Sequence, residues 1–319
     1  MSKKTVLVTG GTGFVGRSLC QRLLERQYRL HLLVRSAPSV NEDMDDSVYF
    51  QGDINDDAVL AKACAGVDTI YHLAAYAHVN QHDTAAMRAV NVEGTRQLLA
   101  AATKAGVRRI VYFSSILADA DLYPELTAYG QAKRDAEALL LAAAQAGDIE
   151  VCCLRPANVY GLGMKGNLLS LLKLIHRGWL PPLPVPSASL CLVGARDLCE
   201  AALLAGDSKA ANRQVYAVTD GKTYSMKGIE SSARKVLKRE PHRWSLPLEA
   251  FYLGFATLEL LGKVLRLRNA PGLRSYRVLS HDTVVSSEKI QAELGYNPAS
   301  SLTSELPEIL QQIAIDRRK

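Results

Sequence analysis

The chain has 319 residues and a mass of 34.7 kDa, which suits one large α/β domain or two modest ones. Hydrophobic residues make up 48%, charged residues 22% and aromatic residues 6%, so disordered, collagen-like and disulfide-built chains are excluded. The net charge of +6 comes from scattered basic residues. It favours anionic small ligands and predicts no nucleic-acid partner, because that partner would need a concentrated basic stripe.

The six cysteines include no C-x-x-C pair, and most stand in apolar runs. The chain opens directly into a strand-like run, without an apolar stretch of signal-peptide length. We therefore predict a cytoplasmic protein in a reducing compartment, with neither zinc nor disulfides. The apolar stretch Phe251–Leu267 is interrupted by Glu259 and Lys263, which argues against an integral membrane segment. An amphipathic packing helix and a membrane-surface helix are both compatible with it.

Short β-rich runs alternate with helical patterns through the first half of the chain. The predicted strands are Thr5–Thr9, Leu30–Val34, Val48–Gln51, Thr69–Leu73, Arg109–Ser114 and Ile149–Leu154. The predicted helices between them are Val15–Arg26, Ala58–Cys64, Thr84–Ala105 and Ala128–Ala146. This alternation predicts an α/β Rossmann fold, a doubly wound parallel sheet with helices on both faces.

The pattern changes after residue 160, where glycines and a proline cluster indicate loops that carry substrate contacts. Two later runs, Ser189–Val193 and Gln214–Val218, again look like strands. We therefore predict a Rossmann domain over residues 1–160, with returning segments at about 188–220. Residues 161–319 are predicted to form mainly a smaller, interleaved C-terminal substrate domain.

A glycine-rich turn follows the first predicted strand and opens the first helix. Gly11, Gly13 and Gly16 satisfy G-x-G-x-x-G, and Gly10 extends the pattern. Glycine permits a tight turn and close approach to a pyrophosphate, while the helix N–H groups face the phosphates; a purely structural turn is the alternative. The predicted cofactor contacts here are Gly10, Thr12, Gly13, Phe14, Val15 and Gly16.

The residue at the end of the second strand distinguishes NAD from NADP, because it contacts the adenosine ribose. An acid there binds a ribose 2′-hydroxyl, whereas an arginine accepts a 2′-phosphate. The chain has Arg35 at this point and no acid before Glu42, so we predict NADP(H), with NAD(H) as the second choice. An exposed surface arginine is the alternative. After the third strand, Asp53 and Ile54 are placed to meet the adenine, with helix capping as the alternative for Asp53.

Tyr129 and Lys133 stand four residues apart and share one helix face. A phenol with a pKa of about 10 is a poor acid or base at neutral pH, and a nearby ammonium lowers that pKa. The ammonium can also hold the nicotinamide ribose while the tyrosine exchanges a proton with an alcohol or ketone. The preceding strand ends at two serines, and Ser115 or Ser114 would bond the substrate oxygen. The predicted catalytic residues are Tyr129, Lys133 and Ser115.

His78 and His82, also four residues apart, superficially resemble paired metal ligands. No third ligand is evident nearby, and the proposed chemistry needs no metal. We therefore predict a loop beside the substrate mouth and no metal site.

Seven motifs are distributed over nearly the whole chain. They are Thr9–Gly16 (TGGTGFVG), Gly52–Ile54 (GDI), Tyr71–Ala75 (YHLAA), Asn91–Thr95 (NVEGT), Phe113–Ser115 (FSS), Tyr129-x-x-x-Lys133 and Arg155–Gly161 (RPANVYG). Together they resemble the extended short-chain dehydrogenase/reductases, also called the NAD-dependent epimerase/dehydratase family. The resemblance implies a Tyr129 acid/base, Lys133 on the ribose, and Asn91 supporting the helix that bears them. It also implies cofactor contacts from Leu73, Ala74, Ala75, Asn91, Lys133, Pro156, Asn158 and Val159.

The second half is similar to members related to 3β-hydroxysteroid dehydrogenases and dihydroflavonol reductases. The runs that carry this similarity are Gln214–Gly221, Leu246–Leu267 and Leu294–Pro298. This branch implies an oxidoreductase that interconverts a ketone and a secondary alcohol on a bulky, rather apolar small molecule. The alternative is a UDP-sugar 4-epimerase or 4-ketoreductase, whose diphosphate Arg177, Arg196, Arg243 and Arg274 could bind. A non-catalytic NADP(H)-binding sensor is a third class. The family resemblance further implies a homodimer through a four-helix interface.

Overall fold

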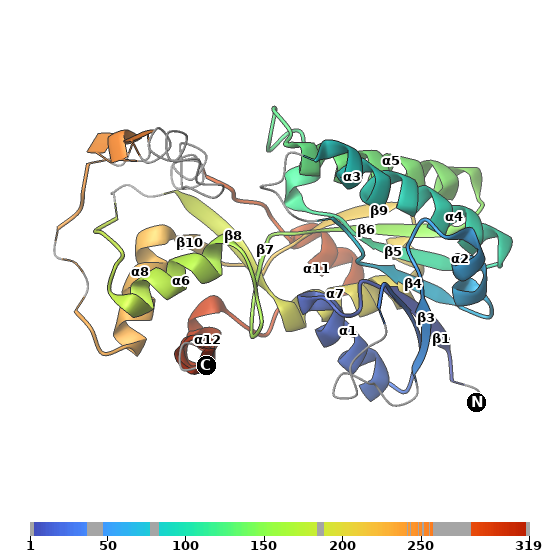
Figure 1. The fold of residues 1–319 in the computed structure, drawn as a ribbon, viewed down its shortest axis with the longest axis horizontal. Coiled ribbons are helices and arrows are strands. Elements are labelled where there is room, and N and C mark those ends of the chain that lie inside the picture. Colours follow the sequence, from blue (N-terminus) through green and yellow to red (C-terminus); the bar gives the residue numbers. More distant parts are fainter. Residues whose placement is uncertain are drawn as a thin grey trace. The chain divides into compact units, whose positions relative to one another are not determined.

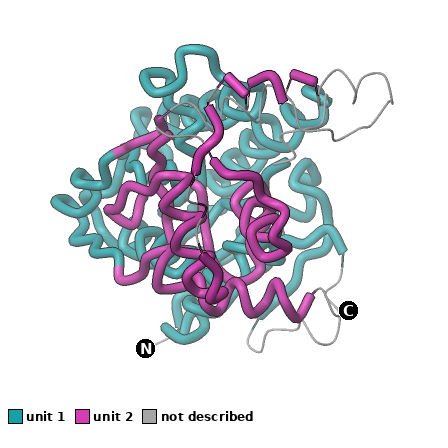
Figure 2. Tube along the Cα trace, turned by 90° about the vertical axis from the view of Figure 1, so that its left-hand side faces the viewer, with its two compact units in different colours: residues 1–157, 195–218, 286–298 teal, residues 158–194, 219–285, 299–319 magenta. Residues whose placement is uncertain are grey.

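The computed structural model describes residues 3–36, 47–76, 83–183, 188–240 and 282–316. It also describes residues 242, 244–247, 249–250, 252–254 and 256–257. The chain divides into two compact units, which Figure 2 colours separately. The first comprises residues 1–157, 195–218 and 286–298, and the second comprises residues 158–194, 219–285 and 299–319.

Within the described residues, the first unit holds a seven-stranded sheet in which every neighbouring pair is parallel. In spatial order the strands are β3 (Ser47–Gln51), β2 (Arg29–Val34), β1 (Thr5–Thr9), β4 (Thr69–His72), β5 (Arg109–Phe113), β6 (Glu150–Pro156) and β9 (Gln214–Val218). The strand order reverses between β1 and β4. In a doubly wound sheet, this reversal point is where ligands bind, beyond the carboxyl ends of the strands.

Helices cover both faces of this sheet (Figure 1). One face carries α2 (Asp57–Cys64), α4 (Gly94–Lys104) and α5 (Ala128–Ala146), and the other carries α1 (Phe14–Glu25) and α7 (Ala195–Asp207). A short helix, α11 (Glu288–Leu294), packs beside β9. Leu60, Leu98 and Leu140 bring α2, α4 and α5 into one hydrophobic core with strand residues. All five residues of β5 are buried, as a strand covered on both faces requires. The predicted Rossmann fold is confirmed.

One predicted helix is helical as expected but contains a wider, π-helical turn. The run Thr84–Ala105 is divided into α3 (Thr84–Arg88), a π-helical turn (Ala89–Glu93) and α4. Inside the turn, the backbone oxygen of Asn91 accepts a hydrogen bond from Thr95 Oγ1 at 2.7 Å. The side chain of Asn91 bonds the backbone of a residue outside the helix. These side-chain bonds accommodate the wider turn, and π-turns of this kind are frequent at functional sites.

The second unit has its own small sheet. It contains β10 (Thr223–Ser225), β8 (Ser189–Gly194) and β7 (Asn158–Tyr160), with β8 antiparallel to β10 and parallel to β7. Three helices pack together in this unit: α6 (Asn167–Arg177), α8 (Met226–Val236) and α12 (Leu302–Asp316). Of the two later strands, β9 therefore extends the large sheet and β8 belongs to the small one.

Some features singled out in the sequence lie outside the described residues. They are Glu42, His78, His82, Arg243, Arg274 and most of Phe251–Leu267. From the last of these, Tyr252 and Leu253 are described, and both side chains are exposed. None of the helices in the described part of the chain has the length and apolarity needed to cross a membrane.

Candidate active site

The glycine-rich turn joins β1 to α1 at the carboxyl edge of the large sheet. Gly10 has a φ of +74°, and a Cβ there would lie 2.7 Å from the backbone nitrogen of Ala74. A Cβ at Gly16 would overlap the carbonyl oxygen of Gly10. Only glycine at both positions lets the ends of β1 and β4 and the start of α1 come this close.

The first turn of α1 is open to an anionic ligand. Its N-cap, Gly13, offers no side chain to the N–H groups, and the first turn holds no acidic residue. Thr12 and Gly13 are exposed, and Phe14 and Val15 are half-buried. Helix N-terminal N–H groups and the helix dipole attract phosphate, so the predicted turn residues fit the pyrophosphate of a dinucleotide.

The predicted adenosine contacts follow two adjacent strands. Arg35 is exposed and directly follows β2, and Asp53 lies two residues beyond the neighbouring parallel strand β3. The Oδ1 atom of Asp53 accepts a hydrogen bond from the backbone nitrogen of Asn55 at 2.9 Å. The N-cap of α2 is Asp56, so Asp53 does not cap this helix. Ile54 is buried, and its side chain faces Gly94 at the start of α4.

Lys133 is buried beneath the carboxyl end of β5, with 2% of its surface exposed. Its Nζ donates a hydrogen bond to the backbone oxygen of Phe113 at 2.7 Å. The same Nζ lies 4.6 Å from the ring centroid of Tyr112 and 5.9 Å from that of Tyr129. Burial lowers the pKa of Lys133 to about 7. The amino group of Lys133 therefore titrates near neutral pH.

Tyr129 is half-buried in the first turn of α5, and burial raises the pKa of its phenol to about 12, the opposite of the lowering expected from the nearby ammonium. The next residue, Gly130, packs so tightly on a 3-10 turn, Ile116–Ala118, that a Cβ would overlap the carbonyl oxygen of Leu117. The N-cap of that turn is Ser115, whose Oγ accepts a hydrogen bond from the backbone nitrogen of Leu117 at 3.2 Å. This packing fixes the position of the helix that carries Tyr129 relative to the turn that begins at Ser115.

The two candidate serines differ in their surroundings. Ser114 is buried, and within the described residues its Oγ has no hydrogen-bond partner. Ser115 is half-buried. Because its Oγ serves as an acceptor for Leu117, the hydroxyl hydrogen of Ser115 stays available for donation to a ligand.

Three charged side chains form ion pairs near Lys133, and no role was predicted for them from the sequence. They are Asp119, Glu137 and Arg155. Glu137, one turn further along α5, is 3% exposed and bonds the guanidinium of Arg155, with Nη2 and Oε2 2.7 Å apart. Arg155 also pairs with Asp119 at 2.9 Å. The negative charge of Glu137 raises the pKa of Lys133 and opposes the larger effect of burial. The spacing of Lys133 and Glu137 on one helix face was the available signal.

A buried histidine connects the strand ends to the π-turn, and it too was not predicted. His72 ends β4 and is fully buried. Its Nδ1 lies 2.7 Å from Thr9 Oγ1, and its Nε2 lies 2.9 Å from Thr95 Oγ1. Since Thr95 Oγ1 donates to the oxygen of Asn91, it must accept from His72 Nε2–H, which makes Nδ1 the acceptor for Thr9. Burial lowers the pKa of His72 to about 3, so the ring is neutral.

Two neighbouring residues of the π-turn, Asn91 and Val92, contact segments outside it. The Oδ1 atom of Asn91 accepts a hydrogen bond from the backbone nitrogen of Tyr76 at 2.7 Å. Val92, the next residue of the π-turn, packs in one apolar cluster with Ala132, and Tyr129 packs against that cluster. The π-turn and the candidate acid/base therefore share one apolar cluster.

The remaining predicted contacts divide between the two units. Leu73, Ala74 and Ala75 follow β4 and are half-buried, and Pro156 ends β6. Asn158 and Val159 belong to β7 of the second unit. The structure thus brings the glycine turn, the residues after β4 and the Tyr129–Lys133 pair to the carboxyl edge of one sheet.

Residues 6–219 match the family described as NAD dependent epimerase/dehydratase. The chain belongs to this family. It is accordingly an enzyme of the extended short-chain dehydrogenase/reductase type that acts on small molecules, and the resemblance inferred from its motifs is confirmed.

The similar proteins are named for two different classes of enzyme, sugar-nucleotide epimerases and steroid dehydrogenases. A UDP-glucose 4-epimerase from Vibrio cholerae is 32% identical, with 77% of this chain and 79% of the relative aligned. A 3 beta-hydroxysteroid dehydrogenase/Delta 5-->4-isomerase from Mycobacterium tuberculosis is 31% identical, with 96% of this chain and 89% of the relative aligned. A solved UDP-glucose 4-epimerase from Thermotoga maritima shares the fold with a TM-score of 0.77 at 20% identity, covering 98% of this chain and 99% of that one.

We predict that Thr95→Val lowers the free energy of unfolding by about 1–3 kcal/mol, because the buried His72 N–H and Asn91 carbonyl lose a hydroxyl partner. Urea unfolding followed by far-UV circular dichroism measures the change. Thr103→Val is the matched control, since Thr103 is exposed on the same helix, α4. Equal stability of the two variants would contradict the assigned network.

A second prediction concerns the pH dependence of stability. Between about pH 7 and 10, an unfolded Lys133 holds a proton that the folded form lacks, so stability should rise with pH through this window. From pH 6.5 to 9, the wild type should therefore gain about 2 kcal/mol relative to Lys133→Met, which lacks the titrating group. Urea unfolding of both proteins at the two pH values measures the gain. A constant difference between them would show that Lys133 is not desolvated as described.

Proposed function

We propose that this protein is an NADP(H)-dependent oxidoreductase that interconverts a ketone and a secondary alcohol on a bulky, rather apolar substrate. The observation that carries the proposal is the Tyr129–Lys133 pair at the carboxyl end of β5, with Lys133 Nζ held on the Phe113 carbonyl. Bound nicotinamide would supply or accept the hydride. The chain's own residues would then handle the proton and the orientation of the substrate.

The protonation states favour reduction of a ketone. With a pKa of about 12, the phenol of Tyr129 carries its proton at neutral pH and can give it to a developing alkoxide. Ser115 would orient the substrate oxygen through its available hydroxyl hydrogen. Lys133 would hold the nicotinamide ribose, and its positive charge would favour the phenolate that remains after proton transfer.

Support for the substrate class comes from sequence identity with the steroid dehydrogenase over nearly the whole chain. The alignment with the steroid dehydrogenase spans 96% of this chain and so takes in most of the second unit, where we place substrate binding. A 4-epimerase from Escherichia coli O157:H7 aligns over a similar share, 98% of this chain, but at 25% identity against 31% for the steroid dehydrogenase. An apolar ketone, such as a 3-ketosteroid, is therefore the first substrate to test.

We predict that purified protein oxidises NADPH with a ketone of this class, followed by absorbance at 340 nm. Tyr129→Phe should lower the rate by at least about 100-fold while leaving NADPH binding unchanged, because only the proton donor is lost. Tyr123→Phe removes a half-buried phenol from the neighbouring loop and should be silent. Full turnover by Tyr129→Phe would refute the assigned chemistry.

The second candidate is a UDP-sugar 4-epimerase or 4-ketoreductase, favoured by the relative that is 32% identical. Arg177 of the second unit is exposed and has no acidic partner among the described residues, so it could contact a diphosphate. A thermal-shift titration of the NADP⁺-saturated protein separates the candidates. A ligand at 100 times its Kd adds about 2.7 kcal/mol of stability. Stabilisation by UDP, without a response to ketones, would favour the sugar nucleotide.

Cofactor preference gives a further prediction. Arg35 follows β2 and is exposed, as an acceptor of a 2′-phosphate must be. Arg35→Asp should weaken NADPH binding at least tenfold and improve NADH binding, measured by fluorescence titration. Arg29→Asp makes the same charge change at the other end of β2 and should alter neither affinity. An unchanged preference in Arg35→Asp would mean that another residue discriminates the two cofactors.

A further inference from the structure

Both tryptophans of the chain stand on the surface of the second unit. Trp179 is 71% exposed and Trp244 is 60% exposed. Trp179 follows the C-terminal end of α6, and His242 Nε2 lies 3.2 Å from the backbone oxygen of Leu180, the next residue. Trp244, two residues beyond His242, therefore lies near the same end of α6. Two exposed indoles in one corner are unusual for a surface that meets only water.

Cationic side chains stand at the neighbouring C-terminal ends of α6 and α8. Arg177 lies over the ring of Trp179, with Cζ 5.5 Å from the centroid. Arg239, which follows α8, donates hydrogen bonds to the oxygens of Ile175 and His176 and so fastens the end of α8 to the end of α6. The corner, defined as Arg177, Trp179, Lys235, Lys238, Arg239 and Trp244, thus combines four exposed cations with two indoles.

The segment from Ser231 to Glu240, which includes the end of α8, carries more basic than acidic residues. Within residues 231–240, Glu240 is the acidic residue against four basic ones. The fourth basic residue, Arg234, is buried and neutralised by Glu230 at 2.7 Å. The exposed side chains therefore present a net positive charge to any approaching surface.

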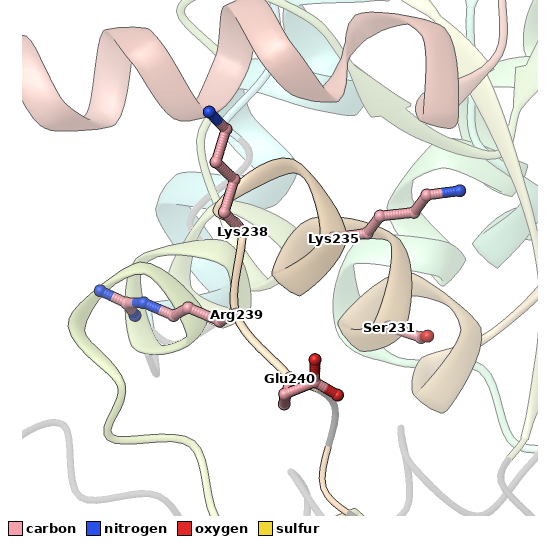
Figure 3. Close-up of a pocket in the computed structure, with 5 residues that line it drawn as sticks. All are labelled: Ser231, Lys235, Lys238, Arg239 and Glu240. Carbon is pink, nitrogen blue, oxygen red and sulfur yellow. The ribbon is translucent and has the colours of Figure 1, made fainter.

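The cations do not converge on one small anion. Lys235, Lys238 and Arg239 line a surface pocket of about 390 Å³ with Ser231 and Glu240. Figure 3 shows their charged ends pointing in three different directions, away from one another. A single phosphate could not contact all three, whereas a broad array of anionic groups could.

We propose that this corner docks the protein on an anionic membrane surface. Basic residues within a Debye length of anionic headgroups are attracted to them, and indoles settle at the headgroup level with the ring in the acyl boundary. The corner supplies both kinds of side chain on elements joined by hydrogen bonds. The occupant is a bilayer that contains anionic lipid, and binding is peripheral and sensitive to salt.

The two indoles give the test its readout, because the whole tryptophan emission of the protein comes from this corner. The full chain is titrated with vesicles of phosphatidylcholine and phosphatidylglycerol in a 3:1 ratio, and with vesicles of phosphatidylcholine alone. We expect a shift of the emission to shorter wavelength and co-sedimentation with the anionic vesicles only. High salt should release the protein.

Substitutions of two lysines test whether this corner is the part of the protein that binds the vesicles. Lys235→Gln combined with Lys238→Gln should weaken binding about 25-fold, at about fivefold per charge. Lys104→Gln combined with Lys209→Gln is the matched control, because both lysines are exposed in the first unit, and its binding should match the wild type. Thermal unfolding of each variant verifies folding, and no substrate is needed, so failure of the proposed function leaves this test intact.

Three results would overturn the proposal. One is an unchanged emission spectrum at millimolar anionic lipid. Another is equal weakening by the control pair of substitutions. The third is binding of a 20-mer duplex DNA through Lys235 and Lys238 without vesicle binding, which would assign the cations to a nucleic acid.

Discussion

The hydrogen bond from Lys133 Nζ to the carbonyl oxygen of Phe113 joins α5 to the end of β5, and the geometry of the candidate site depends on it. An ammonium in an apolar core is costly unless its protons find acceptors and its charge finds a partner. The carbonyl, the ring of Tyr112 and the charge of Glu137 supply part of that compensation, and burial still lowers the pKa of Lys133. Tyr129 lies one turn before Lys133 on α5. The hydrogen bond between Lys133 and Phe113 therefore stabilises the buried lysine and also fixes the position of the Tyr129 phenol.

Two kinds of polar contact support this arrangement. Behind Lys133, Arg155 joins Glu137 to Asp119 by charge. On the side of the π-turn, His72 is held neutral and connects β1, β4 and α4 by hydrogen bonds alone. A neutral network keeps its hydrogen bonds across the pH range in which Lys133 titrates, so the strand ends stay in place whatever the charge of the lysine.

The two proposals assign different tasks to the two units. The first unit carries the glycine turn and the Tyr129–Lys133 pair, and the second carries the cationic corner with its exposed Trp179 and Trp244. An apolar ketone partitions into bilayers, so peripheral docking would bring the enzyme to the phase in which such a substrate is concentrated. Each proposal nevertheless stands on separate residues and separate measurements.

Local patterns in the chain were enough to predict the alternating strands and helices, the glycine turn and the Tyr129–Lys133 pair. These features depend on periodicity and on spacing within one element, which the sequence displays directly. The π-turn, the role of His72 and the charge pairing behind Lys133 depend on tertiary structure. Thr9, His72 and Thr95 are distant in sequence and meet only when parallel strands align their carboxyl ends, and the pKa values follow from burial that no local pattern records.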